Sequence, residues 1–322
     1  MVPCREKPER IDLVLAELQR RGLGEIVTPH RVPLVSLERV HSPRYLHFLR
    51  NAWSEWLALD PANADQDALP ASWPIRGMRA DIEPDSFNGR LGLYSMDSGT
   101  PLTSGTWNAA KTGADCAINA AHALRLGERG SFALTRPPGH HAGADFFGGY
   151  CFLNNAALAA QHLLDDGLKR VAILDIDYHH GNGTQGIFYG RGDVLFVSIH
   201  VDPLSDYPYY LGHADEAGSG EGLGCNMNLP LPRAASAQQW MAALETACIK
   251  LGMFAPEALV VSLGVDTAAG EGGFGLQGAD FLRIGERIAW LGLPTAFVFE
   301  GGLGLDIGIN TVNVLEGFET AA

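Results

Sequence analysis

Short runs of apolar residues alternate along the chain with longer stretches in which apolar residues recur every three or four positions. The short runs are rich in β-branched residues, which is typical of strands buried on both faces of a parallel sheet. We therefore expect strands at Ser131–Thr135, Val171–Asp177, Val194–His200, Leu259–Gly264 and Thr295–Glu300.

The stretches between these runs have the periodicity of amphipathic helices. Strands that alternate with helices in this way predict an α/β fold with a central parallel sheet and helices on both faces. An early helix is marked by one apolar face at Ile11, Val14, Leu15 and Leu18. Further helices are expected at Gly105–Gly127, Asn154–Asp166, Ala235–Phe254 and Gly278–Gly292.

The 322 residues contain no linker-like composition, charge block or repeat, so residues 1–322 are predicted to form a single domain. The proline-rich stretch Asp60–Asp85 is interpreted as a long surface loop within that domain. Such a loop offers a surface for a homo-oligomer, although nothing in the sequence proves one.

The net charge of −14 argues against non-specific nucleic-acid binding, which needs clustered Lys and Arg. No apolar run is long enough to span a bilayer, and the N-terminus lacks an apolar signal core. The scattered cysteines form no CxxC motif, which favours reduced thiols and a cytoplasmic location. They are Cys4, Cys116, Cys151, Cys225 and Cys248.

Ionisable or glycine-rich segments follow the predicted strands at their carboxyl ends, where open parallel sheets bind ligands. The richest is Asp175–Thr184, which holds two Asp and two His within six residues. The others are Arg136–Ala142, Val265–Thr267 and Gly301–Gly304.

Asp177 and His179 are two residues apart as the chain leaves a strand, so their side chains point the same way. Asp266 leaves another strand at the same edge. Two carboxylates and one imidazole leave open positions on a metal for water and substrate, as in catalytic zinc sites. Zinc is the predicted ion, although iron or cobalt also suits these ligands.

His140 and His141 supply the base that such an anionic metal site needs for water activation. Asp175 and Asn182 are placed to bond the outer ring nitrogens of this pair and to fix their tautomers. Taken alone, a His-His pair is more often a loop feature, and Asp266 could be a helix N-cap. The coincidence of several strand ends makes those simpler interpretations weak.

Several segments resemble motifs of the histone deacetylase family, and particularly of bacterial acetylpolyamine amidohydrolases. The resemblance follows the family's order over nearly the whole chain from about Pro3 onward. The segments are Arg136–Ala142, Gly148–Asn155, Asp175–Thr184, Val194–Pro203, Ser262–Asp266, Glu300–Gly302 and Ile307–Glu319.

The resemblance implies an arginase-like (deacetylase) fold and hydrolysis of an acyl amide. Asp177, His179 and Asp266 match the family's zinc ligands, and His141 matches the general base and acid. His140 matches its electrostatic partner, backed by Asp175, while Asn182 matches the residue that bonds His141. Gly149, Tyr150 and Tyr207 are similar to the walls of the substrate tunnel. A structural K⁺ site is implied at Asp175, Asp177, His179, Ser198 and Ile199.

The chain departs from the family pattern at three places. Leu303 stands where the family usually has a tyrosine that donates to the developing oxyanion; one such donor contributes roughly 10²–10³ in rate. Asn88 and Gly99 stand where polyamine-specific relatives place carboxylates, so a polyamine is not predicted, although Asp97 could substitute. The chain also opens directly on a helical pattern, whereas relatives begin with a strand.

We therefore expect a zinc-dependent amidohydrolase acting on a small or extended acylated amine and weak on acetyl-lysine, because Leu303 cannot donate a hydrogen bond. The alternative is a metal-holding acyl-group binder or an esterase with little deacetylase activity. A two-metal ureohydrolase is disfavoured, because the sequence offers the ligands of one metal only.

Overall fold

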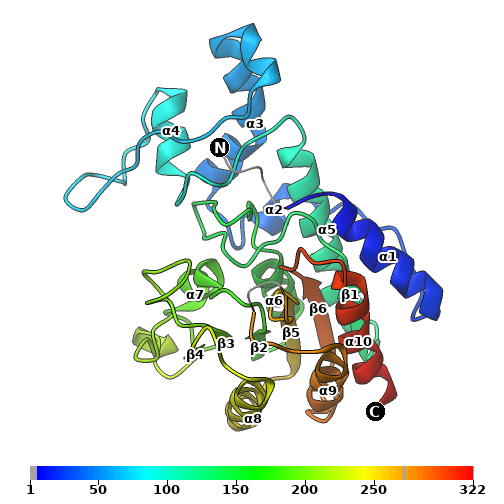
Figure 1. Ribbon diagram of the computed structural model, residues 1–322. Helices are drawn as coiled ribbons and strands as arrows, with labels where there is room; N and C mark the ends of the chain where they lie inside the picture. Colours follow the sequence, from blue (N-terminus) through cyan, green and yellow to red (C-terminus); the bar gives the residue numbers. More distant parts are fainter. Residues whose placement is uncertain (1–5, 271–272, 322) are drawn as a thin grey trace.

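The computed structural model describes residues 6–270 and 273–321. Within these residues, the strands form one six-stranded parallel sheet in the order β1-β6-β5-β2-β3-β4. The sheet confirms the predicted α/β class (Figure 1). Its strands are β1 (Gly130–Ala133), β2 (Val171–Asp175), β3 (Val194–Val201), β4 (Asn226–Leu231), β5 (Ala258–Leu263) and β6 (Thr295–Phe299).

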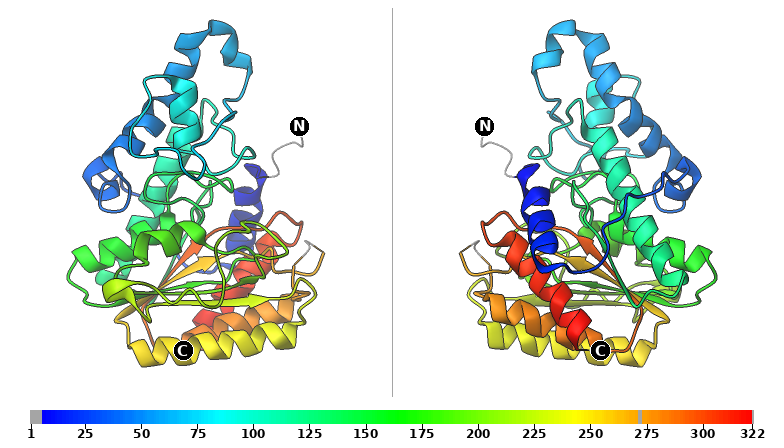
Figure 2. Two further views of the ribbon diagram at one scale, coloured as in Figure 1. Left: turned by 90° about the vertical axis from the view of Figure 1, so that its left-hand side faces the viewer. Right: turned by 90° about the vertical axis from the view of Figure 1, so that its right-hand side faces the viewer.

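Helices cover both faces of the sheet, and Figure 2 shows α8 and α9 below it and α3 and α5 above it. The N-terminal helix α1 packs beside the C-terminal helix α10 (Figure 1). The α-helices are α1 (Glu9–Arg21), α2 (Leu34–Leu37), α3 (Pro43–Leu59), α4 (Phe87–Leu93), α5 (Thr106–Arg125), α6 (Asn155–Asp165), α7 (Asn182–Phe188), α8 (Ala237–Phe254), α9 (Gly278–Ala289) and α10 (Ile307–Thr320). Short 3₁₀ turns are η1 (Pro61–Asp65) and η2 (Gly220–Gly222).

Two apolar clusters form the core, one on each face of the sheet. Successive residues of a strand point to opposite faces, so Ile173 joins the cluster under α3, α5 and α6. Its neighbours Ala172 and Leu174 join the cluster over α8, α9 and α10. Strands β2, β3, β5 and β6 are buried along their whole length, as their continuous apolar sequence predicts.

The edge strands differ from the sequence interpretation. The prediction that every strand is buried on both faces is wrong for β1, because three of its four residues are only half-buried at the sheet edge. Strand β4 was not predicted, because Asn226 and Asn228 interrupt its apolar pattern. These two amides are buried and bond Gln185. Pro230 in the same strand is tolerated at an edge.

Helix α3 was also not predicted, although its start carries a recognisable signal. The Ser42 side chain accepts a hydrogen bond from the backbone N–H of Tyr45, and Pro43 occupies the first helical turn. The stretch Asp60–Asp85 is largely exposed and irregular apart from η1, as expected of a surface loop. Within it, Ala68 pairs with Leu102 in an isolated antiparallel bridge.

The strand order places the predicted chemistry at one point. The chain runs outward from β2 through β3 to β4, and then returns to β5 on the other side of β2. The crevice between β2 and β5 is therefore the topological switch point, where open α/β sheets bind ligands. Asp175 ends β2 in register with Ser262 of β5, so the segments that follow both strands emerge side by side.

No helix among the described residues is long and apolar enough to cross a membrane. The cysteines within the described ranges are free thiols: Cys116, Cys151, Cys225 and Cys248. Cys4 lies outside the described residues.

Candidate active site

A pocket of ≈ 530 Å³ lies beyond the carboxyl ends of β2, β5 and β6. It collects residues from loops that are more than a hundred positions apart in the sequence. Of the predicted site residues, it is lined by Asp97, His140, His141, Gly149, Tyr150, Asp177, His179, Tyr207, Asp266 and Leu303. It is also lined by residues that the sequence did not single out, among them Glu6, Arg10, Asp206 and Arg233.

Asp177, His179 and Asp266 form a cluster that could hold a metal ion, with one donor atom of each within 4.8 Å of the others. His179 Nδ1 lies 3.4 Å from Asp177 Oδ1 and 3.2 Å from Asp266 Oδ2. The Gly301 backbone N–H donates to Asp177 Oδ2 at 2.8 Å. A Cβ at Gly301 would lie 2.4 Å from Asp177 Oδ2 and 2.7 Å from Asp266 Oδ2, so only glycine allows this approach. The donor set suits a divalent cation.

The charges of this cluster also favour a cation. Burial and the neighbouring Asp177 raise the pKa of Asp266. Burial would lower the pKa of His179, but its contacts with Asp177 and Asp266 outweigh it and raise that pKa to about 10. A bound ion would take the place of the proton that His179 otherwise attracts, because metal ligands must be deprotonated.

The two adjacent histidines have different partners. His140 Nδ1 lies 3.1 Å from Asp175 Oδ2, whereas His141 Nδ1 lies 2.7 Å from Asn182 Oδ1. The ring centroids are 4.0 Å apart. Because the Asn182 carbonyl oxygen only accepts, it fixes His141 as the Nδ1–H tautomer and leaves Nε2 as a proton acceptor.

These partners separate the two pKa values. Burial opposes the charged form of both rings, but Asp177 and Asp175 outweigh it at His140 and raise its pKa to about 10. Burial and the positive charges on His140 and His179 lower the pKa of His141 well below its usual value. A charged His140 beside a neutral His141 is the kind of split that distinguishes an electrostatic group from a base.

Glu300 supports the loop that carries the histidine pair. Its buried carboxylate accepts hydrogen bonds from the backbone N–H groups of Gly139, at 2.6 Å, and His140, at 3.2 Å. Burial raises the pKa of this carboxyl to about 7. The sequence marked Glu300 only as part of a motif, because its partners lie more than 150 residues away.

His41 supports the same loop from a segment that gave no sequence signal. Its Nδ1 lies 2.9 Å from the Gly143 carbonyl oxygen, and its Nε2 accepts from the Asn154 backbone N–H at 3.0 Å. Burial lowers the pKa of His41 to about 4, so the ring is neutral at pH 7. It links the histidine loop to the start of α6.

Asp97 connects two of the predicted substrate walls. Its Oδ2 accepts from the Gly149 backbone N–H at 2.6 Å and from the Tyr207 hydroxyl at 2.8 Å. The Tyr207 ring stands perpendicular to His141, with centroids 5.0 Å apart. Gly149 has a φ of 56°, and a Cβ there would lie 2.3 Å from His141 Cδ2, so glycine is required. Tyr150 follows in the same left-handed region.

Leu303 lines the pocket with 45% of its surface exposed. Four tyrosines elsewhere in the chain are candidates to supply the hydroxyl group that Leu303 lacks: Tyr94, Tyr178, Tyr209 and Tyr210. Tyr94 is fully buried and bonds Glu83, and Tyr209 and Tyr210 do not line the pocket. Tyr178 does line it, but its ring packs against Phe274, 4.9 Å away.

Three of the predicted K⁺ ligands lie on the neighbouring strands β2 and β3. Asp175 and Ser198 are partners in the β2–β3 register, and Ile199 follows in β3. The Ser198 hydroxyl lies 2.8 Å from His200 Nδ1, and Asp175 Oδ1 accepts from the Asp177 backbone N–H at 3.1 Å. The potassium site stays a prediction.

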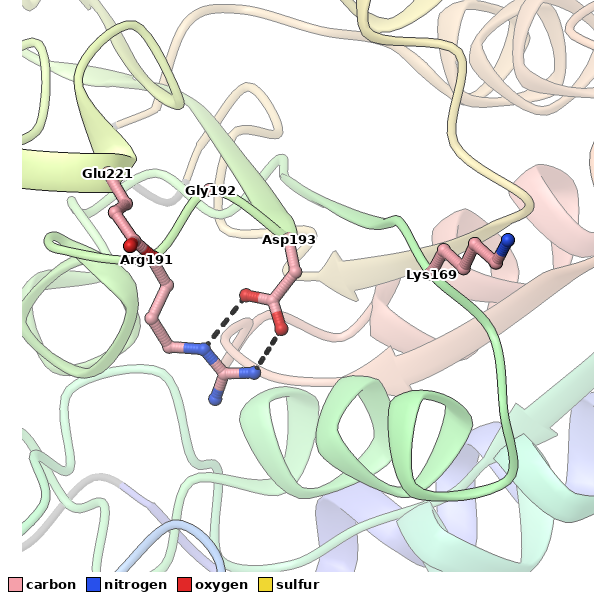
Figure 3. A pocket seen from close by; sticks show the side chains of 5 residues that line it. All are labelled: Lys169, Arg191, Gly192, Asp193 and Glu221. Atoms are coloured by element: carbon pink, nitrogen blue, oxygen red, sulfur yellow. Dashed lines mark hydrogen bonds and ion pairs between the residues drawn. The ribbon is translucent and has the colours of Figure 1, made fainter.

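A second pocket, of ≈ 380 Å³, lies at the opposite edge of the sheet, where β2 and β3 begin. Figure 3 shows Arg191 paired with Asp193 through two hydrogen bonds, with Lys169 pointing away from them. This pocket contains none of the predicted site residues.

The chain is similar to known proteins over nearly its whole length. The family model described as histone deacetylase domain matches residues 4–314. Acetylpolyamine amidohydrolase 1 of Pseudomonas aeruginosa is 52% identical over 99% of this chain and 93% of its own length. Acetylpolyamine amidohydrolase of Mycoplana ramosa is 44% identical over 98% of this chain and 93% of its own length.

The fold of the chain is also similar to that of a solved structure. The crystal structure of acetylpolyamine aminohydrolase from Burkholderia pseudomallei superposes with a TM-score of 0.92 at 38% identity, covering 98% of this chain and 92% of that one. The family model and these relatives together show that the chain belongs to the histone deacetylase family and is a hydrolytic enzyme.

Proposed function

We propose that the chain is a zinc-dependent amidohydrolase that removes an acyl group from an acylated amine, with acylated polyamines as the leading substrate class. One observation carries the proposal: the Asp177–His179–Asp266 cluster lies in the same pocket as the neutral His141. A zinc ion held by these three residues would polarise an acyl carbonyl and a water molecule.

The chain's own residues then divide the work. His141 Nε2, held in its tautomer by Asn182, accepts the proton of the attacking water and returns it to the leaving amine. His140, kept charged by Asp175 and Asp177, stabilises the negative charge that develops nearby. Tyr207 and Gly149, tied together by Asp97, hold a narrow extended chain beside His141.

The polyamine class rests on the relatives and on the charge of the pocket. Relatives up to 52% identical are named acetylpolyamine amidohydrolases. Asp97 and Asp206 line the pocket, and the net charge of −14 favours the approach of a cationic substrate. Opposing this, Arg233 pairs with Asp206 at 3.0 Å, and the sequence lacks two expected rim carboxylates. A cytoplasmic location and a homo-oligomer stay predictions.

The test is a substrate panel: N-acetylputrescine, N¹-acetylspermidine, an acetyl-lysine peptide and p-nitrophenyl acetate. We expect the zinc-loaded protein to hydrolyse the acetylated diamines fastest, a chelator to abolish turnover and added zinc to restore it. If the zinc-loaded protein cleaves no acylated amine, the function is not that of an amidohydrolase. If turnover survives chelation, the metal-dependent assignment is wrong.

Leu303 favours a second candidate, an acyl-group binder or esterase with weak amidase activity. Leu303→Tyr should then raise kcat on an acetyl-lysine peptide by about 10²–10³-fold, because it supplies the missing donor to the developing oxyanion. Leu305→Tyr is the matched control, since Leu305 is 92% exposed and outside the pocket. Equal rates in wild type and Leu303→Tyr would mean that this donor does not limit turnover.

A further inference from the structure

A second cluster of metal-binding side chains lies on the surface, where α5 and α6 end. His122 is in the last turn of α5, His162 is in the last turn of α6, and Asp166 directly follows α6. One donor atom from each lies within 4.8 Å of the others. None of these residues lines the candidate active-site pocket.

The three side chains converge on one carboxylate oxygen. Asp166 Oδ2 lies 3.5 Å from His162 Nε2 and 3.7 Å from His122 Nδ1. These separations are too long for good hydrogen bonds, and His162 Nε2 is buried without a hydrogen-bond partner. They match the spacing between donor atoms that share an ion at 2.0–2.2 Å from each.

The helices hold this arrangement in place. His162 and Asp166 are four residues apart, so they lie on the same side of α6. His122 comes from α5, which packs along α6, and the two imidazole centroids are 5.7 Å apart. Because the two packed helices already hold these two histidines and the aspartate together, a metal ion can bind without a rearrangement of the backbone.

Neighbouring charges leave the cluster open to a cation. The adjacent Asp165 is already paired with Arg39 at 2.9 Å and accepts from the Gln161 amide. Among the described residues, no Lys or Arg side chain is paired with the Asp166 carboxylate; Arg125 bonds only its backbone carbonyl oxygen. The side chains of His122 and Asp166 are 52% and 34% exposed, so an ion reaches them directly from solvent.

We propose that His122, His162 and Asp166 form a surface site for a divalent transition-metal ion such as Zn²⁺ or Ni²⁺, separate from the candidate active site. Imidazole nitrogens with a carboxylate suit these ions better than Mg²⁺ or Ca²⁺. Water completes the coordination on the exposed side. The ion joins the ends of α5 and α6 and stabilises the folded chain, because unfolding separates its ligands.

The experiment uses the full chain carrying Asp266→Ala, which removes the candidate active-site cluster. Equilibrium dialysis against Zn²⁺ and, separately, Ni²⁺ measures the ions bound per chain. We expect one ion per Asp266→Ala chain, and two Zn²⁺ per wild-type chain. Adding His122→Ala, His162→Ala or Asp166→Asn should weaken the remaining site by at least about tenfold, since even outer-shell losses cost 10–100-fold. His47→Ala, at an exposed histidine of α3, is the matched control.

Thermal unfolding gives a second readout. Ni²⁺ should raise the unfolding midpoint of Asp266→Ala by a few degrees, and His122→Ala should abolish that rise without lowering the metal-free midpoint. Unchanged Zn²⁺ and Ni²⁺ affinities in all three ligand variants would overturn the proposal. When His122→Ala is introduced alone, with Asp266 intact, turnover should equal that of wild type. The surface-site proposal can therefore fail without affecting the proposed function, and the reverse also holds.

Discussion

The charged side chains at the two edges of the parallel sheet differ in their burial and in their partners. At the amino edge, Arg191 and Asp193 form a bidentate pair with side chains 34% and 40% exposed (Figure 3). At the carboxyl edge, Asp175 and Asp177 are 0% and 1% exposed, and their charged neighbours are histidines. Both edges have a pocket, but of the two pockets, as lined by the described residues, only the one at the carboxyl edge contains buried carboxylates such as Asp177.

The difference favours the carboxyl-edge pocket as the candidate active site. Partly exposed pairs such as Arg191–Asp193 cost little and contribute little, because water screens them. Burying carboxylates without Lys or Arg partners is costly, so such groups persist where a cation or a reaction uses them. The buried carboxylates Asp177 and Asp175 outweigh burial and raise the pKa of His140, whereas burial and the charges on His140 and His179 lower that of His141.

The largest expected effect is on catalysis at the carboxyl edge. His141→Gln should lower kcat on an acetylated diamine by about 10²–10⁴-fold, since the variant keeps a side chain of similar shape but loses the base. Zinc content, measured by elemental analysis, should stay at the wild-type value. If the variant keeps most of its turnover, the general base is a residue other than His141. The carboxyl edge would then lose its main functional difference from the amino edge.

The second expected effect is a loss of unfolding free energy in acid, caused by the buried His41 near the carboxyl edge of the sheet. The pKa of His41 falls from 6.5 to about 4 on folding, so the unfolded chain binds this proton first as pH drops. The ring therefore contributes stability above pH 6.5 that is lost between pH 6.5 and 4, about 3 kcal/mol in order of magnitude.

Denaturant unfolding of wild type and His41→Gln across this pH range measures that contribution. Wild type should lose more free energy of unfolding than the variant as the pH falls. His200, with a pKa also lowered to about 4, remains in both proteins and gives a common background. Parallel curves would mean that His41 is not buried as a neutral ring.

The smallest effect is expected at the amino edge. Arg191→Ala should change the free energy of unfolding by about 0–1 kcal/mol, because water reaches and screens this partly exposed pair, and should leave kcat/KM unchanged. Denaturant unfolding and the diamine assay measure both. A tenfold fall in kcat/KM would show that the amino-edge pocket takes part in function.

Much of the fold could be predicted from the sequence, because buried parallel strands such as β2 and β3 are nearly continuous apolar runs. Edge strand β4 could not, since its buried amide groups donate to Gln185, about forty residues away. The start of α3 could have been predicted from Ser42 and Pro43. Its packing on the face of the sheet that α5 also covers (Figure 2) could not be predicted.

The candidate site divides in the same way. Asp177, His179 and Asp266 could be proposed from their positions after strands, and the structure brings them together. The supporting roles of Glu300 and His41 had no local signal, because each depends on backbone groups more than 100 residues away. The bond between Asp97 and Tyr207 is equally distant in sequence.

The sequence by itself determined the α/β class, the strand ends that carry ionisable residues and the candidate metal-binding side chains. Those features depend on residue types and spacing within one segment. Only the tertiary structure decided which histidine is charged, how Asp97 joins Gly149 to Tyr207, and that His122 meets Asp166. Burial and the approach of distant segments set those properties, and neither is a property of a local stretch of chain.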